Sequence, residues 1–336
     1  MMEKLLTVIV PVYQVEAYIR KCLDSLVIDS DLMSRMDVLI VNDGTLDRSA
    51  EISREYVARF PGVFRQIDKE NGGHGSVWNL GVQEAYGKYV KFLDSDDWLE
   101  NLDKMLRKLD QTDVDLAITS CICHCPGDKL WKLEIKDMEF DKVYDADRFD
   151  WLGNRSHGNY ILHHCAVYRT EMLRQYLPLF LENQHYDDMI LGAVSIIGAT
   201  TLVAWDLEVY QYLIGREGSS SRTVRPENAD AKRKVYQSII DFIEKHPIAD
   251  PASTKRLYFQ VKLPKLYSYG YRTLLLDSCS YRDAKLHCEA WDNWVRQRNP
   301  NMTSRWIRLY RQCPFFLYWC WYKCYAKGVK LYQRVA

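Results

Sequence analysis

The first 120 residues alternate between two patterns of hydrophobic and polar positions. Five short apolar runs, rich in β-branched residues, are typical of strands buried on both faces. These runs span residues 5–13, 36–43, 63–68, 88–94 and 114–120. Apolar residues at helical spacing follow the first four runs, over residues 17–28, 47–60, 75–87 and 100–110. Strands that alternate with helices predict a mostly parallel sheet with right-handed crossovers and helices on both faces.

Beyond residue 125 the pattern weakens. The elements expected there are a helix over residues 186–199, one or two strands over 200–214, and helices over 227–245 and 253–277. The first of these helices begins with two aspartates, which suit the positive end of a helix dipole. The sequence therefore predicts an α/β domain over residues 1–222 and a mainly helical extension over residues 223–336.

Polar groups stand at the ends of three predicted strands. The first strand ends at residues 11–13, the second at 42–44, and the fourth at "DSDD", residues 94–97. Because ligands of such sheets bind outside the carboxyl ends of the strands, we expect these residues to face one crevice. Carboxylates this close repel one another, so a divalent cation, a ring of donors or exposure at a turn must compensate. Two acidic strand ends at one edge favour a binding site over a plain turn.

The overall charge argues against a general nucleic-acid-binding protein. The chain has 336 residues, with 45 Lys plus Arg and 45 Asp plus Glu, so its formal net charge is zero. No Asp or Glu follows Asp292, and residues 293–336 carry nine Lys or Arg among many aromatic residues. Such a tail is typical of an interfacial segment on an anionic membrane. A helix that closes the core, or a contact in a homodimer, explains it equally well.

The sequence gives no sign of export. Residues 1–4 lead directly into the first strand run without a cleavage site, and no window approaches the roughly 20 apolar residues that span a bilayer. We therefore expect a cytoplasmic protein with reduced cysteines. If the tail binds lipid, the protein would be peripheral on the inner face of the plasma membrane. Cys121, Cys123 and Cys125 flank His124, but a strand end with buried thiols explains this spacing better than a zinc site does.

Six short stretches in fixed order carry a family resemblance. They are "VIVPVY" (8–13), "VNDGTLD" (41–47), "ENGGHGSVWNLG" (70–81), "FLDSDDW" (92–98), "YDDMI" (186–190) and "GREGSSS" (215–221). Together they resemble glycosyltransferase family 2, the inverting nucleotide-sugar transferases of the GT-A fold. The resemblance covers about residues 5 to 222. It implies a GT-A, Rossmann-like sheet for the first domain.

The resemblance also implies a site for a UDP-sugar donor. Asp43 would accept a hydrogen bond from the uracil imide, residues 11–13 would shape the base pocket, and Asn71 and Gly73 would pass close to the nucleotide. Arg216, in the Gly/Ser loop, would reach the diphosphate. The full set expected on the donor side is Pro11, Tyr13, Asp43, Asn71, Gly73, Asp94, Ser95 and Arg216.

The same resemblance assigns the metal and the base. "DSDD" matches the family's Asp-x-Asp motif, so Asp96 would hold Mn²⁺ or Mg²⁺, with Asp94 on the ribose or on metal-bound water. Asp188 would be the base that takes the acceptor's proton. The choice between Asp187 and Asp188 stays open, because the motif departs from the usual Glu-Asp pair. Asp187 and His164 are placed on the acceptor side.

The function predicted on this basis is transfer of a sugar from a UDP-sugar to a saccharide or lipid-linked saccharide, during assembly of a cell-surface polysaccharide. Two alternatives remain. An inactive sugar-nucleotide or glycan-binding subunit would lack the carboxylates, which are present here. A nucleotidyltransferase would carry a glycine-rich basic loop after the first strand, and "PVYQVEAYIRK" (11–21) has none.

Overall fold

The computed structural model divides the chain into two compact units. The first comprises Met1–Ser219 with Ile248–Lys255, and the second comprises Ser220–Pro247 with Arg256–Ala336. The residues that the structure describes are 3–28, 30–133, 138–153, 163–184, 186–215, 227–278 and 280–320. The first unit contains the sheet, and each unit is considered by itself.

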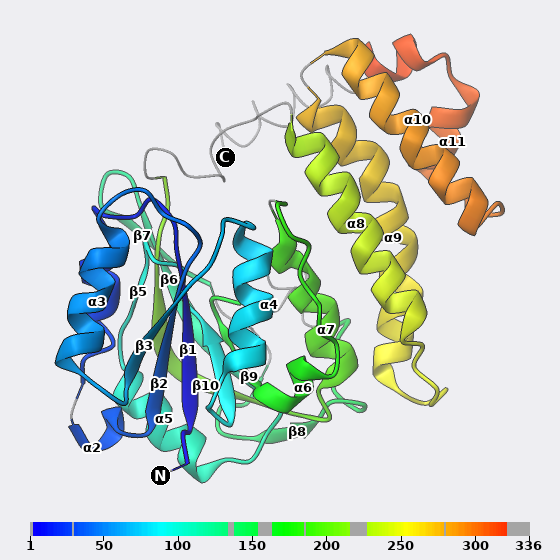
Figure 1. Cartoon of the computed structure of the whole chain (residues 1–336). Coiled ribbons are helices and arrows are strands. Elements are labelled where there is room, and N and C mark those ends of the chain that lie inside the picture. The colour runs from blue at the N-terminus through cyan, green and yellow to red at the C-terminus, as the bar shows by residue number, and fades with distance from the viewer. Residues whose placement is uncertain are drawn as a thin grey trace. The chain divides into compact units, whose positions relative to one another are not determined.

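A ten-stranded sheet forms the centre of the first unit (Figure 1). Its main path runs β3-β2-β1-β4-β9-β6-β10-β5, with β7 paired to β6 and β8 paired to β10. The strands are β1 Leu6–Val12, β2 Met36–Asn42, β3 Phe64–Asp68, β4 Tyr89–Phe92, β5 Trp98–Leu99, β6 Leu116–Cys125, β7 Lys129–Leu133, β8 Val143–Asp145, β9 Ala166–Arg169 and β10 Thr201–Leu213. The predicted apolar runs became β1, β2, β3, β4 and β6, and β1 and β2 are almost wholly buried.

Helices cover both sides of this sheet, which confirms the predicted fold class. They are α1 Ile19–Asp24, α2 Ser30–Met33, α3 Ser49–Arg59, α4 His74–Glu84, α5 Leu102–Gln111, α6 Thr170–Arg174, the 3₁₀ turn η2 Asp187–Met189 and α7 Ile190–Gly198. The pairs β1–β2, β2–β3 and β1–β4 are parallel, as the alternation of strands and helices requires. Antiparallel β9 lies between β4 and β6, so the sheet as a whole is mixed.

One ion pair with a buried carboxylate ties together three strands of the α/β half. Asp37 on β2 is 2% exposed and accepts from Arg65 on β3, with its Oδ1 2.7 Å from Arg65 Nε. The Thr7 hydroxyl and the Tyr86 amide donate to the same carboxylate. A buried carboxylate with four donated hydrogen bonds keeps its charge at low cost. It joins three strands to the turn that enters β4.

Helices make up most of the described part of the second unit, and those predicted over residues 227–245 and 253–277 are present as α8 and α9. The helices are α8 Glu227–Lys245, most of α9 Thr254–Asp277, α10 Tyr281–Arg298 and α11 Arg305–Gln312. The fully buried Trp291 donates from its indole N–H to the Tyr267 carbonyl at 3.1 Å. A Cβ on Gly270 would lie 2.1 Å from the Trp291 ring, so only glycine allows this close approach.

Part of the basic tail packs within this unit. Asp292, 7% exposed, accepts from Tyr271, Arg296 and Arg311. Burial alone would raise the pKa of Asp292, but these three donors lower it below its usual value. For Arg296 and Arg311 the structure therefore gives the packing role that the sequence left open, whereas Arg305 and Arg308 are exposed. No helix in the described part of the chain is long and apolar enough to cross a bilayer. Residues 321–336 lie outside the described residues.

Replacement of Arg65 tests the importance of the buried pair. Arg65→Ala should lower the free energy of unfolding by about 3 kcal/mol, because it leaves the buried Asp37 charge without its cation. Arg54→Ala is the matched control, since the Arg54–Asp68 pair on the same edge of the sheet is about half exposed on both sides. It should cost less than about 1 kcal/mol. Urea unfolding midpoints measure both, and equal shifts would contradict the role given to Asp37.

Candidate functional site

The loop after β3 is organised by the carboxylate of Asp43. Asp43 follows β2 and is 3% exposed. Its Oδ1 accepts from Lys69 Nζ at 2.8 Å and from the Gly72 amide at 2.9 Å, and its Oδ2 accepts from the Gly73 amide at 2.8 Å. Gly73 has φ +78°, a conformation that side-chain-bearing residues rarely adopt. Asp43 thus shapes the Asn-Gly-Gly turn, and the oxygen that Gly73 contacts still has acceptor capacity.

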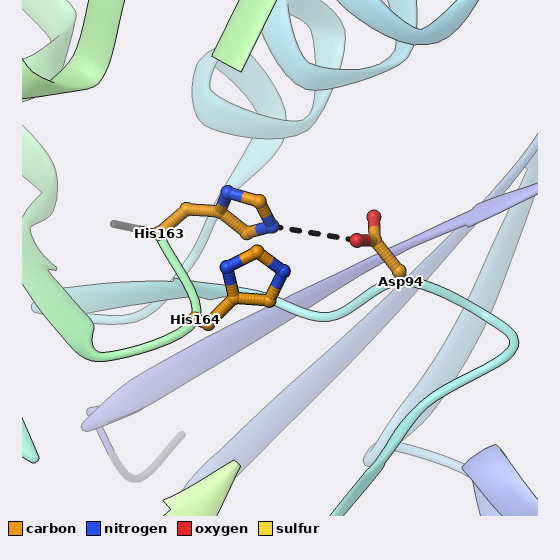
Figure 2. Close-up of side chains that lie close together, drawn as sticks. All are labelled: Asp94, His163 and His164. Carbon is orange, nitrogen blue, oxygen red and sulfur yellow. Dashed lines mark hydrogen bonds and ion pairs between the residues drawn. The ribbon is translucent and has the colours of Figure 1, made fainter. Parts of the chain in front are cut away.

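The next residue along the chain, His74, links this loop to the acidic strand end. His74 begins α4, and its Nε2 lies 3.5 Å from Oδ1 of Asp94, just after β4. The other carboxylate oxygen of Asp94 lies 3.3 Å from Nε2 of His163, in the segment before β9 (Figure 2). Asp94 is therefore held between two imidazole rings from different elements.

The same two histidines reach the aspartates of "YDDMI". His74 Nδ1 lies 3.1 Å from Oδ1 of Asp187, and His163 Nδ1 lies 3.5 Å from Oδ2 of Asp188. Asp187 and Asp188 begin the 3₁₀ turn η2, ahead of α7. Acids and bases alternate in the order Asp187, His74, Asp94, His163, Asp188. Each carboxylate has an imidazole beside it.

The alternation of acids and bases shifts the pKa values of both histidines and of two of the three aspartates. Burial opposes the charge on His163, but Asp188 and Asp94 raise its pKa to about 9. Burial likewise opposes the charge on His74, and Asp187 and Asp94 raise its pKa well above the usual range. Burial would raise the pKa values of Asp94 and Asp188, but hydrogen bonds from the histidines lower both. The arrangement therefore holds ionised carboxylates and charged imidazoles at neutral pH.

A buried tryptophan supports both histidines. Trp78 lies one turn after His74 on α4 and is fully buried. Its ring centroid is 4.0 Å from that of His74, 4.9 Å from that of His163 and 4.2 Å from that of Phe92, on which it stacks. Close packing against one rigid ring fixes both imidazoles where they meet Asp94.

His164 is a different kind of histidine from its neighbour. It is 8% exposed, and burial together with the charge of His163 lowers its pKa to about 3. Its ring packs on that of His163 at 3.8 Å and against Tyr210 and Tyr212. Figure 2 shows one nitrogen of each histidine ring turned toward Asp94. Ligand atoms of Asp94, His163 and His164 all lie within 4.8 Å of one another, close enough to hold a metal ion.

Comparison with known proteins gives the family. A model described as glycosyl transferase family 2 matches residues 7–177, half of the chain. The chain belongs to glycosyl transferase family 2. The resemblance seen in the sequence motifs is thereby confirmed.

Relatives in the family and solved structures agree with this assignment. The chain is 35% identical over 143 residues to glycosyltransferase GlyA of Streptococcus pneumoniae, covering 42% of this chain and 20% of GlyA. It is 42% identical over 111 residues to the putative glycosyltransferase EpsH of Bacillus subtilis, covering 32% of this chain and 31% of EpsH. The matches thus span a fifth to a third of these relatives. S. aureus TarS 1–349, solved with UDP-GlcNAc, has the same fold, with a TM-score of 0.57, 21% identity and 92% of each chain covered.

The remaining predicted site residues differ in exposure and in the contacts that they make. Pro11 lies in β1, and Tyr13, just beyond it, is 46% exposed, while Ser95 is buried. Asn71 donates to the Asp43 carbonyl, which keeps it in the donor-side loop. Asp96 lies between Ser95 and Asp97 but does not belong to the group of ligand atoms that includes Asp94. Arg216 lies outside the described residues.

Asp97 is held by strand β10 and does not cap a helix. It is 1% exposed and accepts from the Tyr210 hydroxyl and the Leu213 amide of β10, whereas α5 begins after Asn101. Burial and the charges of Asp94 and Asp96 raise the pKa of Asp97 to about 9. Asp97 is therefore protonated and uncharged at neutral pH.

Sequence reasoning missed His74, His163 and Trp78. A signal for two of them was present, because His74 and Trp78 stand four apart in "HGSVW" and so share one helix face. His163 gave no local signal, since its contacts come from residues 69 and 25 positions away.

Asn79 connects α4 to the segment that leads to η2. Its Oδ1 accepts from the Leu179 and Phe180 amides at 2.8 and 3.0 Å, and its Nδ2 donates to the Phe180 carbonyl. Asn79→Ala should lower the free energy of unfolding by about 2 kcal/mol, because two backbone N–H groups lose their acceptor. Gln83→Ala, an exposed change on the same helix, should stay within about 0.5 kcal/mol. Urea unfolding checks both, and an equal effect would remove Asn79 from this role.

Proposed function

We propose that this chain is an inverting glycosyltransferase that moves a sugar from a UDP-sugar to a saccharide or lipid-linked saccharide acceptor, in the assembly of a cell-surface polysaccharide. The observation that carries the proposal is Asp188, an ionised carboxylate joined through His163 to the strand-end Asp94. A base on one side and a donor-binding strand end on the other are what a single displacement at a sugar carbon requires.

Exposure favours Asp188 over Asp187 as the base. The Asp188 side chain is 30% exposed, whereas that of Asp187 is 3% exposed and faces His74. Both oxygens of the Asp187 carboxylate lie within 3.3 Å of His74 Nδ1, so Asp188 has the carboxylate that is more open to an acceptor hydroxyl. In the proposed step the acceptor oxygen bonds to the anomeric carbon, the bond from that carbon to the diphosphate breaks, and Asp188 takes the hydroxyl proton. UDP is the leaving group.

The donor would occupy the ends of β1, β2 and β4. Tyr13 and Pro11 would contact the base, and the free acceptor capacity of Asp43 would meet the uracil imide. Asn71, Gly73, Asp94 and Ser95 would line the ribose and diphosphate, with Arg216 closing on the phosphates. The fold shared with TarS, a protein solved with UDP-GlcNAc and with UDP, supports a nucleotide-sugar donor.

A divalent cation fits this site. Asp94 and Asp96 bring carboxylate oxygens to the strand end, and such ions prefer oxygen ligands. Asp96 would hold Mn²⁺ or Mg²⁺, with Asp94 on the ribose or on metal-bound water. Such an ion would neutralise the leaving diphosphate.

Substitution of the base tests the proposal. Screening against a panel of UDP-sugars should identify a donor that the chain hydrolyses or transfers. With that donor, Asp188→Asn should keep donor affinity and lower kcat by at least about 10²-fold, because it keeps shape and removes basicity.

Asp187→Asn is the matched control one residue away. It should change kcat much less, since Asp187 is buried against His74. The reverse result would move the base to Asp187. Donor binding without turnover by the unaltered chain would favour the inactive binding subunit.

The second unit suggests that the enzyme works on a membrane surface. Arg305 and Arg308 are exposed on α11, and Phe316 and Leu317, a short way along the chain, are 57% and 58% exposed. A segment that carries both exposed cations and exposed apolar side chains is typical of segments that lie on anionic lipid. This proposal suits a lipid-linked acceptor.

Liposome flotation tests the membrane proposal. The chain should float with anionic liposomes at low salt and partly detach at 1 M salt, where the Debye length falls to about 3 Å. Arg305→Gln with Arg308→Gln should weaken binding, at about 1 kcal/mol per cation. Lys104→Gln with Arg107→Gln, exposed cations of α5, removes the same charge elsewhere and should not. Equal binding by both double variants, or none by the parent, would contradict the proposal.

A further inference from the structure

We infer that Asp94, His163 and His164 form a binding site for a divalent transition metal ion, with both imidazoles as ligands, and that this site prefers Mn²⁺ to Mg²⁺. The inference deepens the proposed function, since it names residues and an ion beside the proposed base. It rests on that function for the use of the ion but not for its binding.

The spacing of the ligand atoms suits one ion. Nε2 of His163 lies 3.3 Å from Oδ2 of Asp94, and ligand atoms of all three residues lie within 4.8 Å of one another. Two ligands about 2.1 Å from a metal and at right angles to each other are separated by about 3.0 Å. The pair from His163 and Asp94 therefore needs only a small shift to accept an ion between them. Figure 2 shows His164 turning a nitrogen toward the same carboxylate.

The two histidines are not ordinary core residues. They are 4% and 8% exposed; Nδ1 of His163 faces Asp188, and Nδ1 of His164 has no hydrogen-bond partner within the described ranges. Buried ring nitrogens in folded proteins are usually satisfied, so the partnerless Nδ1 of His164 is unusual for a core histidine. A core histidine with both nitrogens satisfied, the plain explanation for His164, does not fit.

The surroundings match those of metal-bound histidines in general. A histidine that binds a metal commonly directs its other ring nitrogen at a carboxylate, which fixes the ring. His163 has this arrangement, because its Nδ1 faces Asp188 Oδ2 at 3.5 Å while its Nε2 faces Asp94. The rings of Tyr210 and Tyr212 pack against the His164 ring. An ion bound by Asp94 and His163 would be separated from the proposed base, Asp188, by the His163 ring alone.

The donor set determines which ion fits. Mg²⁺ favours oxygen ligands, whereas imidazole suits the divalent transition metals. Two nitrogens and one carboxylate leave open positions for water or phosphate oxygen. Asp96 does not belong to this group, so the site shares only Asp94 with the one that the Asp-x-Asp motif suggests.

Electron spin echo spectroscopy of bound Mn²⁺ tests the inference directly. The full chain, without an affinity tag and stripped of metal, is loaded with Mn²⁺ in the absence of nucleotide. Modulation from two directly bound imidazole ¹⁴N nuclei should appear. Competition titrations should show Mn²⁺ bound at least about tenfold more tightly than Mg²⁺.

Three variants and a control assign the signal. His163→Gln and His164→Gln should each remove one nitrogen and weaken Mn²⁺ binding by at least about tenfold. His287→Gln is the matched control, because His287 also lies beside an aspartate, Asp283 on α10, and should change nothing. Asp96→Ala should keep both nitrogens. Circular dichroism confirms that each variant folds, and the spectrum of the unaltered chain is informative even if one does not.

The outcomes separate this site from the proposed function. Mn²⁺ bound by oxygen ligands alone, no Mn²⁺ binding, or equal affinity for Mg²⁺ would overturn the inference. Loss of the ¹⁴N signal in Asp96→Ala, with retention in the histidine variants, would also overturn it. A chain that shows both nitrogens but transfers no sugar would confirm the site and remove the proposed function.

Discussion

Charge compensation around Asp94 is the constraint on which the rest of the site depends. Asp94, Asp187 and Asp188 come from two segments far apart in the chain, and without cations between them their mutual repulsion would force them apart. His74 and His163 provide those cations, each placed between two carboxylates. The geometry of the strand end and that of the η2 turn are therefore coupled.

Residues 69–79 link the strand end and the η2 turn to the loop that is expected to contact the nucleotide. Asp43 holds the turn at Gly72 and Gly73, and His74 follows at once with its contacts to Asp94 and Asp187. Five residues later, Asn79 holds the segment that leads to η2. One short helix thus positions both the loop expected to meet the donor and the turn that carries the proposed base.

The strands and the donor-side motifs could be predicted from sequence because local signals encode them. Apolar runs ending in Asp43 and Asp94 place both residues at one edge of a parallel sheet, whatever the later topology. The mixed half of the sheet could not be predicted in the same way. Strand β9 has four residues and pairs antiparallel between β4 and β6, which a short apolar segment does not reveal.

The histidine contacts were beyond sequence reasoning for a similar reason. His163 and His164 look alike in "ILHHCAVYR", yet one is charged between two carboxylates and the other stays neutral against tyrosine rings. Only the tertiary neighbours separate them. The same holds for Asp187 and Asp188, which differ in exposure and not in local pattern.

The central claim is that imidazolium groups hold the carboxylates together when no metal is bound. Nitrogen-15 NMR of histidine-labelled, metal-free protein tests it, with His163→Gln used to assign the resonances. His163 should carry protons on both ring nitrogens at pH 7.5, titrate with a pKa of about 9, and have a lower pKa in Asp94→Asn. A neutral His163 at pH 7.5, or a pKa that Asp94→Asn leaves unchanged, would contradict it.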